Sequence, residues 1–192
     1  MKKLIILLIM TIPLIGCVAA VPIALVAGAT AGGAVIYDKR SFNTMSEDQN
    51  ARSYAQRWLN SDPVLKGHSH ISVAVFNNIA LLVGQAQTPE IRARAYQIIS
   101  RVKNIKRIYN EITIEGPTST LQRTSDSWIT TKVRTAMLTK SGLRSTNLKV
   151  ITENGVVYLM GAVTRKQAAL ATDVARRVSG VTKVVRVFEY DQ

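Results

Sequence analysis

Residues 154–190, NGVVYLMGAVTRKQAALATDVARRVSGVTKVVRVFEY, decide the fold because residues 78–114 repeat their pattern as NIALLVGQAQTPEIRARAYQIISRVKNIKRIYNEITI. Each copy opens with a short apolar strand that ends at a glycine, Gly84 in the first copy and Gly161 in the second. A segment with apolar residues at helical spacing follows, and then another strand. The chain therefore contains one strand–helix–strand unit twice.

A threonine marks the start of the helix in each copy. Thr88 precedes a proline at the first helical position, and Thr164 forms a capping box with Gln167. Each helix ends before a residue that tolerates the left-handed conformation, Asn104 or Gly180. The local signals thus agree on the same element boundaries in both copies.

The residues before each copy extend the repeat. Residues 70–76 and 147–153 alternate apolar and polar side chains, as half-buried strands do. Asn154-Gly155 is a strong hairpin signal, and Asn77-Asn78 is a weaker one. Two helical segments precede these hairpins, at about residues 47–60 and 127–140. Each module therefore reads helix, strand, strand, helix, strand, which predicts an α+β protein.

That order, with a glycine closing the second strand, resembles the BON domain family. The stretches SDSWITTKVRTAML (125–138), KVITENGVVYLMG (149–161) and ARRVSGV (175–181) are similar to the second domain of Gram-negative outer-membrane lipoproteins with two BON domains. The resemblance implies tandem BON domains, each a three-stranded mixed sheet packed against two helices. It also implies binding of anionic phospholipid, chiefly phosphatidylglycerol, a role in outer-membrane integrity, and localisation to the division site.

Residues 1–16 have the pattern of a lipoprotein signal peptide. Lys2 and Lys3 precede an apolar core, and Leu14-Ile15-Gly16-Cys17 is a lipobox. We expect the Cys17 sulfur to take a diacylglycerol and its freed amine to take a further acyl chain, which suffices for stable anchoring. An uncleaved anchor with an incidental cysteine is the alternative. The next residue is Val18 and not aspartate, so the predicted location is the outer membrane, facing the periplasm.

Residues 17–45 connect this anchor to the first module. Residues 18–36 carry no charge but are rich in alanine and glycine, so their helix propensity is modest. We interpret them as a pliable apolar tether near the lipid surface. A membrane-packing helix rich in small residues is the alternative.

The sequence divides the remaining chain into two domains, at residues 46–115 and 125–192. Residues 116–124 begin with Gly-Pro and are rich in small hydroxyl side chains, so we predict a linker there. The sequence leaves open whether the domains pack together, and it favours a monomer.

Positive charge is concentrated in the second module. The whole chain has a formal net charge of +13, to which residues 46–115 contribute +3 and residues 125–192 contribute +6. Such an excess favours polyanionic partners, either anionic lipid headgroups or nucleic acid. Because the signal peptide directs the chain out of the cytoplasm, we predict an anionic phospholipid membrane and no nucleic acid. The alternative is that the basic residues form a solvated face that only makes the protein soluble. This alternative is enough to explain the smaller positive charge of the first module.

Trp128 is the most informative single residue. On a helix it lies away from the core stripe of Ile129 and Val133, so it points outward. An outward tryptophan beside cations suits a bilayer interface. The predicted lipid-binding residues are Trp128, Thr131, Lys132, Arg134, Thr135 and Leu138. Two other interpretations of Trp128 are a staple at the start of the helix and a contact with the other module.

Nothing in the sequence indicates catalysis. His68 and His70 are the only histidines, and no carboxylate cluster lies near them, so we predict neither a metal site nor a cofactor besides the acyl chains on Cys17. The serines and threonines lack a neighbouring activating base. We therefore predict that the chain is not an enzyme.

These observations favour an outer-membrane lipoprotein whose second BON domain binds anionic phospholipid. One alternative is an envelope assembly protein that binds another envelope protein or peptidoglycan. A second alternative is a haemolysin-like, membrane-damaging protein, although the modules contain no long amphipathic or spanning segment.

Overall fold

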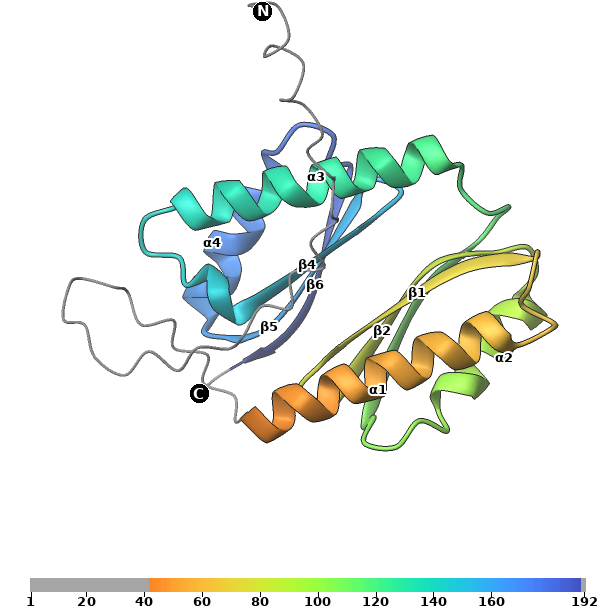
Figure 1. Ribbon diagram of the computed structural model, residues 1–192. Coiled ribbons are helices and arrows are strands. Elements are labelled where there is room, and N and C mark those ends of the chain that lie inside the picture. Colours follow the sequence, from red (N-terminus) through yellow and green to blue (C-terminus); the bar gives the residue numbers. More distant parts are fainter. Residues whose placement is uncertain (1–41, 191–192) are drawn as a thin grey trace, which may run out of the picture. The chain divides into compact units, whose positions relative to one another are not determined.

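The computed structural model describes residues 42–190, with side chains from residue 43 onward. All of these residues belong to one compact unit, in which the same order of elements occurs twice (Figure 1). Module 1 consists of α1 (Phe42–Ser61), β1 (Ser69–Phe76), β2 (Ile79–Ala86), α2 (Pro89–Ile99) and β3 (Arg107–Ile114). Module 2 consists of α3 (Thr120–Thr139), the short 3-10 helix η1 (Ser145–Asn147), β4 (Leu148–Glu153), β5 (Val156–Val163), α4 (Arg165–Arg176) and β6 (Lys183–Tyr190).

Each module contains a three-stranded mixed sheet. In module 1, β2 lies between β1, which runs antiparallel to it, and β3, which runs parallel. In module 2, β5 lies between β4 and β6 in the same way. The expected α+β fold with two αββαβ units is therefore confirmed.

One aspartate ties the first helix of each module to the hairpin. The carboxylate of Asp48 on α1 accepts bonds from the backbone N–H groups of Asn77 and Asn78, at 2.7 and 2.9 Å. The carboxylate of Asp126 on α3 accepts the equivalent bonds from the β4–β5 turn, at 2.8 and 2.9 Å. A carboxylate that bonds two backbone N–H groups fixes both the position and the rotation of its helix.

Gly84 and Gly161 lie two residues before the ends of β2 and β5, and not at the strand ends as the sequence predicted; close approach of the backbone requires a glycine at both positions. A Cβ on Gly84 would lie 2.0 Å from the carbonyl oxygen of His70, and a Cβ on Gly161 would lie 2.4 Å from that of Asn147. Gly84 also has a φ of +122°, which side chains rarely allow. The repeated glycine therefore lets the first strand of each hairpin begin close against the backbone of the second.

The helices cover one face of each sheet. Ala55 and Leu59 of α1 share a buried cluster with Ile99 of α2 and with the strands of module 1. Val133 and Met137 of α3 form the corresponding cluster with the strands and α4 in module 2.

The opposite faces of the two sheets meet in a third apolar cluster. Phe76 and Leu81 of module 1 lie in it with Tyr158 and Met160 of module 2. Burial, together with the nearby carboxylates of Glu111 and Glu153, raises the pKa of Tyr158 to about 12. The two modules therefore pack together through a shared apolar core. The sequence had left this packing open.

Polar bonds surround this shared cluster. The Gln85 side-chain amide donates to Glu153 at 2.8 Å, and the Asn77 amide donates to Glu189 at 2.6 Å. Lys149 Nζ of module 2 donates to the carbonyl oxygen of Val75 in module 1 at 2.9 Å. Each bond joins one module to the other.

Three expectations need correction. Helix α3 begins at Thr120 and not near residue 127, so residues 120–124 of the predicted linker are helical. Ser119 caps the helix by accepting a bond from the backbone N–H of Gln122, and Gln85 binds Thr118 just before it. The half-buried pattern predicted for residues 70–76 is also wrong, because Ala74 and Phe76 face module 2 and are buried. Helix α1 likewise begins earlier than expected.

Candidate functional site

An exposed stripe runs along the whole of α3. Its members recur at alternating spacings of three and four residues, and all are exposed: Leu121, Thr124, Trp128, Thr131, Thr135 and Leu138. The opposite side of α3 carries the buried residues of the helix, among them Ile129 and Val133. We call the six exposed residues the α3 stripe; its ends, Leu121 and Leu138, are about 25 Å apart along the helix.

The α3 stripe contains no charged residue, and its apolar members are highly exposed. The exposed fractions are 80% for Leu121, 66% for Trp128 and 69% for Leu138. The threonines between them hide part of their polarity. Thr124 and Thr131 each donate their hydroxyl to the carbonyl oxygen four residues earlier, at 3.0 Å. Their methyl groups therefore contribute to the surface while the hydroxyls are already bonded within the helix.

Two cations flank the stripe and hold their positions through neutral partners. The ammonium of Lys132 donates to the carbonyl oxygen of Ser179, in the loop after α4. The guanidinium of Arg134 donates to the carbonyl oxygen of Val150 on β4 at 3.2 Å. A carbonyl oxygen positions a cation without neutralising it. Both charges therefore remain available to an anion beside the stripe.

Arg94, Arg176 and Arg177, in contrast, are paired with carboxylates. Arg176 and Arg177 bind Asp173, and these hydrogen bonds hold the pKa of Asp173 below its ordinary value. Arg94 binds Asp62 at 2.8 Å. Burial alone would raise the pKa of Asp62, but the bonds from Arg94 and two backbone amides outweigh it and keep that pKa low. Lys132 and Arg134 differ from these structural ion pairs.

The structure brings the predicted residues together on one surface. Trp128, Thr131, Thr135 and Leu138 lie on the α3 stripe, with Lys132 and Arg134 beside it. The interpretation of Trp128 as a staple at the start of the helix is wrong, because α3 begins eight residues earlier, at Thr120. The Trp128 side chain is 66% exposed. Whether these residues bind lipid stays a prediction.

Leu121 is the stripe residue that the sequence reasoning missed. The Gly-Pro pair and the small hydroxyl residues that precede it predict a linker at this position. Extending the three-and-four spacing of the predicted site back from Trp128 leads to Thr124 and Leu121. That periodicity was a usable signal, although the start of the helix was not.

Module 1 has a different surface at the same place. Counting from the anchoring aspartates, Asn50 of α1 occupies the position of Trp128, and Asn60 occupies that of Leu138. The exposed aromatic residues of α1 are Tyr54 and Trp58, and Arg57 stacks on the Tyr54 ring at 4.7 Å. These aromatics lie on another side of the helix. The apolar stripe is therefore particular to α3.

No catalytic or metal centre is evident among residues 42–190. No group of three or more His, Cys, Asp or Glu side chains in this part of the chain could hold a metal ion. His68 Nδ1 is 2.9 Å from the Gln87 side-chain oxygen. None of the described helices is both long and apolar enough to cross a membrane. The predicted lipidation site, Cys17, and the tether at residues 18–36 lie outside the described residues.

The two modules define the chain as a member of the BON domain family. The model of the BON domain matches residues 47–116 and 125–192. The chain is 36% identical to the outer membrane lipoprotein DolP of Haemophilus influenzae over 190 residues, which cover 99% of this chain and 96% of that protein. The expected class and location, an outer-membrane lipoprotein with two BON domains, are confirmed by these similarities.

Two further similarities are weaker or narrower. The chain is 37% identical to a protein named 21 kDa hemolysin from Actinobacillus pleuropneumoniae, over 155 residues that cover 81% of this chain and 80% of that one. Among solved structures, CdsD of the Chlamydia trachomatis type III secretion system aligns with a TM-score of 0.30 and 16% identity, covering 75% of this chain and 63% of that chain. At that TM-score the likeness says nothing about function.

Proposed function

We propose that the α3 stripe binds the surface of a membrane rich in anionic phospholipid, with phosphatidylglycerol as the preferred headgroup. The observation that carries this proposal is the stripe itself, which combines exposed Leu121, Trp128 and Leu138 with no charged residue. An indole ring is favourable at headgroup depth, and leucine side chains are favourable just below it. Lys132 and Arg134 contact lipid phosphates from either side.

The helix lies parallel to the membrane plane in this arrangement. A stripe about 25 Å long rests along the interface, and the module core stays on the water side. Acyl chains on Cys17 supply the permanent anchor, and the stripe selects anionic regions within the leaflet. The protein acts without catalysis, supporting outer-membrane integrity, and the division site is the region to which we expect it to localise.

The direct test is binding to vesicles of phosphatidylglycerol and of phosphatidylcholine. Residues 41–192 suit this test because all three apolar clusters lie within them and no acyl anchor obscures the result. We expect binding to phosphatidylglycerol only, and a loss of about tenfold or more for Trp128→Ala. Trp58→Ala is the matched control, since it removes an exposed tryptophan of α1.

Other outcomes separate the alternatives. Binding that Trp128→Ala and Trp58→Ala weaken equally would remove the site from α3. Absence of binding to either vesicle would reject the lipid proposal and favour an envelope-protein partner. Release of a trapped dye from the vesicles would support a membrane-damaging activity, as the name of the Actinobacillus relative suggests for that protein.

A further inference from the structure

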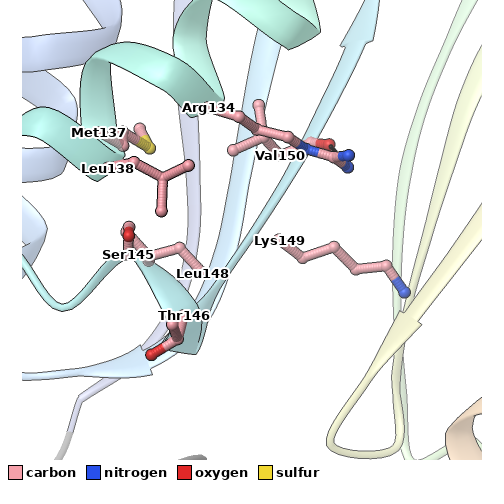
Figure 2. Close-up of a pocket in the computed structure, with 8 residues that line it drawn as sticks. All are labelled: Arg134, Met137, Leu138, Ser145, Thr146, Leu148, Lys149 and Val150. Carbon is pink, nitrogen blue, oxygen red and sulfur yellow. Dashed lines mark hydrogen bonds between the residues drawn. The ribbon is translucent and has the colours of Figure 1, made fainter. Parts of the chain in front are cut away.

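A cavity opens beside the α3 stripe, between α3 and β4. It has a volume of about 200 Å³. Figure 2 shows the side chains that line it: Arg134, Met137, Leu138, Ser145, Thr146, Leu148, Lys149 and Val150. Met137 and Val150 are 1% and 4% exposed, so the deepest part of the lining is apolar and belongs to the module core.

The charged side chains of this cavity lie away from its apolar part. Arg134 extends to the carbonyl oxygen of Val150 and is otherwise exposed. Lys149 points away, toward β1, where it binds the carbonyl oxygen of Val75. Leu138 belongs both to the α3 stripe and to the cavity wall. An apolar hollow with a guanidinium beside it thus continues directly from the proposed membrane-contact surface.

Module 1 contains a hollow at the corresponding place, with different chemistry. It lies between α1 and β1 and includes Gln56 and Asn60 in its lining. These residues stand at the positions that Arg134 and Leu138 occupy in module 2, counted from the aspartates that anchor the helices. Gln56 uses both ends of its amide on β1, donating to Ile71 O and accepting from Val73 N. The fold therefore forms this hollow in both modules. Module 1 has two side-chain amides there, whereas module 2 has an arginine and a leucine at the same positions.

The size and chemistry of the module 2 cavity identify its ligand. Its volume of about 200 Å³ is smaller than that of a typical small-molecule site, roughly 300–1,000 Å³. The cavity therefore suits part of one acyl chain better than a whole ligand. Its apolar depth excludes a headgroup, and its guanidinium matches a phosphate. We propose that this cavity accepts one acyl chain of an anionic phospholipid, bent out of the leaflet, while Arg134 binds the phosphate of the same molecule. This inference rests on the proposed function of the α3 stripe.

The test uses a lipid that is presented as single molecules. Residues 41–192 are titrated with lysophosphatidylglycerol, which has one acyl chain, below its critical micelle concentration, and with glycerophosphoglycerol, which has none. The methyl signals of Met137, Leu148 and Val150 are followed by NMR. Thr146→Phe places a ring in the cavity from an exposed position. Ser69→Phe places a ring in the hollow of module 1 from a half-buried position.

We expect the lysolipid to shift the three methyl signals, glycerophosphoglycerol to leave them unchanged, and Thr146→Phe to weaken lysolipid binding about tenfold or more. Ser69→Phe should retain binding. If the methyl signals do not shift in a protein that still binds phosphatidylglycerol vesicles, the cavity does not bind an acyl chain. The proposed role of the α3 stripe would be unaffected by that result. Equal shifts with glycerophosphoglycerol, or equal losses in both variants, would also overturn the cavity proposal. If the protein binds no vesicles, the proposed function of the α3 stripe is wrong, and the cavity proposal that rests on it is wrong as well.

Discussion

Asp126 and Trp128 lie two residues apart on α3 and point to opposite sides of it. Asp126 is 4% exposed and binds the backbone N–H groups of Asn154 and Gly155, whereas Trp128 is 66% exposed. Residues two positions apart on a helix differ by about 200° around its axis. The bonds that fix the rotation of α3 therefore also determine which side chains face outward.

We predict that Asp126→Ala destabilises the protein without acting on the lipid site directly. Loss of two charge-assisted bonds to a buried turn should lower the free energy of unfolding by about 2–4 kcal/mol. Asp48→Ala, which removes the same anchor from module 1, should cost a similar amount. Denaturant unfolding measures both values. Asp126→Asn should lie between the wild type and Asp126→Ala, and an unchanged stability in both alanine variants would contradict the anchoring role.

Substitution of the hairpin glycines should be more damaging than their small size suggests. Gly161→Ala places a Cβ 2.4 Å from the carbonyl oxygen of Asn147, so the backbone itself has to move. We expect a loss of about 3 kcal/mol or more in the free energy of unfolding. Gly84→Ala adds an unfavourable φ to a closer clash and should be worse. Gly116→Ala is the control, because nothing lies within 4 Å of its Cβ position and it should be nearly neutral.

The repeated element order could be read from the sequence because its signals are local. Thr88 and Thr164 accept a bond from the N–H three residues later, as their capping positions predict. Asn104 and Gly180 have positive φ, as the ends of the two helices require. The outward direction of Trp128 likewise follows from helical spacing alone.

The start of α3 and the junction between the modules depend on contacts distant in the sequence. Thr118, just before α3, is held by Gln85 of β2, and no local pattern around Thr118 indicates that partner. Tyr158 looks like an ordinary strand residue until the sheet of module 1 covers it. The sequence does not predict the exposed helical position of Leu121 because the start of α3 depends on the distant residue Gln85. It does not predict the burial of Phe76 because that burial depends on the sheet of the other module.

The cations beside the α3 stripe should make lipid binding depend on salt. Arg134→Gln installs the residue that module 1 has at this position and removes one charge. We expect it to weaken binding to phosphatidylglycerol vesicles by about 1 kcal/mol at low ionic strength and to reduce the dependence on salt. Arg176→Gln is the matched control, because Arg176 is already paired with Asp173. Vesicle sedimentation at several salt concentrations measures both, and equal effects would reject a specific role for Arg134.

The junction between the modules should respond to pH through Glu153. Burial raises the pKa of Glu153 above its ordinary value of 4.5, although the bond from Gln85 opposes this. The folded protein therefore holds that proton more tightly than the unfolded chain, so this carboxyl lowers stability as pH rises above about 4.5. Glu153→Gln retains an acceptor for Gln85 and carries no charge. We expect it to raise the Tm at pH 7, with a gain that disappears near pH 4.

The comparison with an exposed carboxyl isolates this effect. Glu47→Gln on α1 removes the same charge from an exposed position, so its Tm should follow that of the wild type at both pH values. Asp62 has a lowered pKa, so its contribution to stability is lost as pH falls below about 3.8. This contribution is the same in the wild type, Glu153→Gln and Glu47→Gln, so it does not affect their comparison. A Tm gain for Glu153→Gln that is equal at pH 4 and pH 7 would show that packing, and not the cost of a buried charge, distinguishes the variant. Only a gain that grows with pH assigns the effect to the ionised carboxylate between the modules.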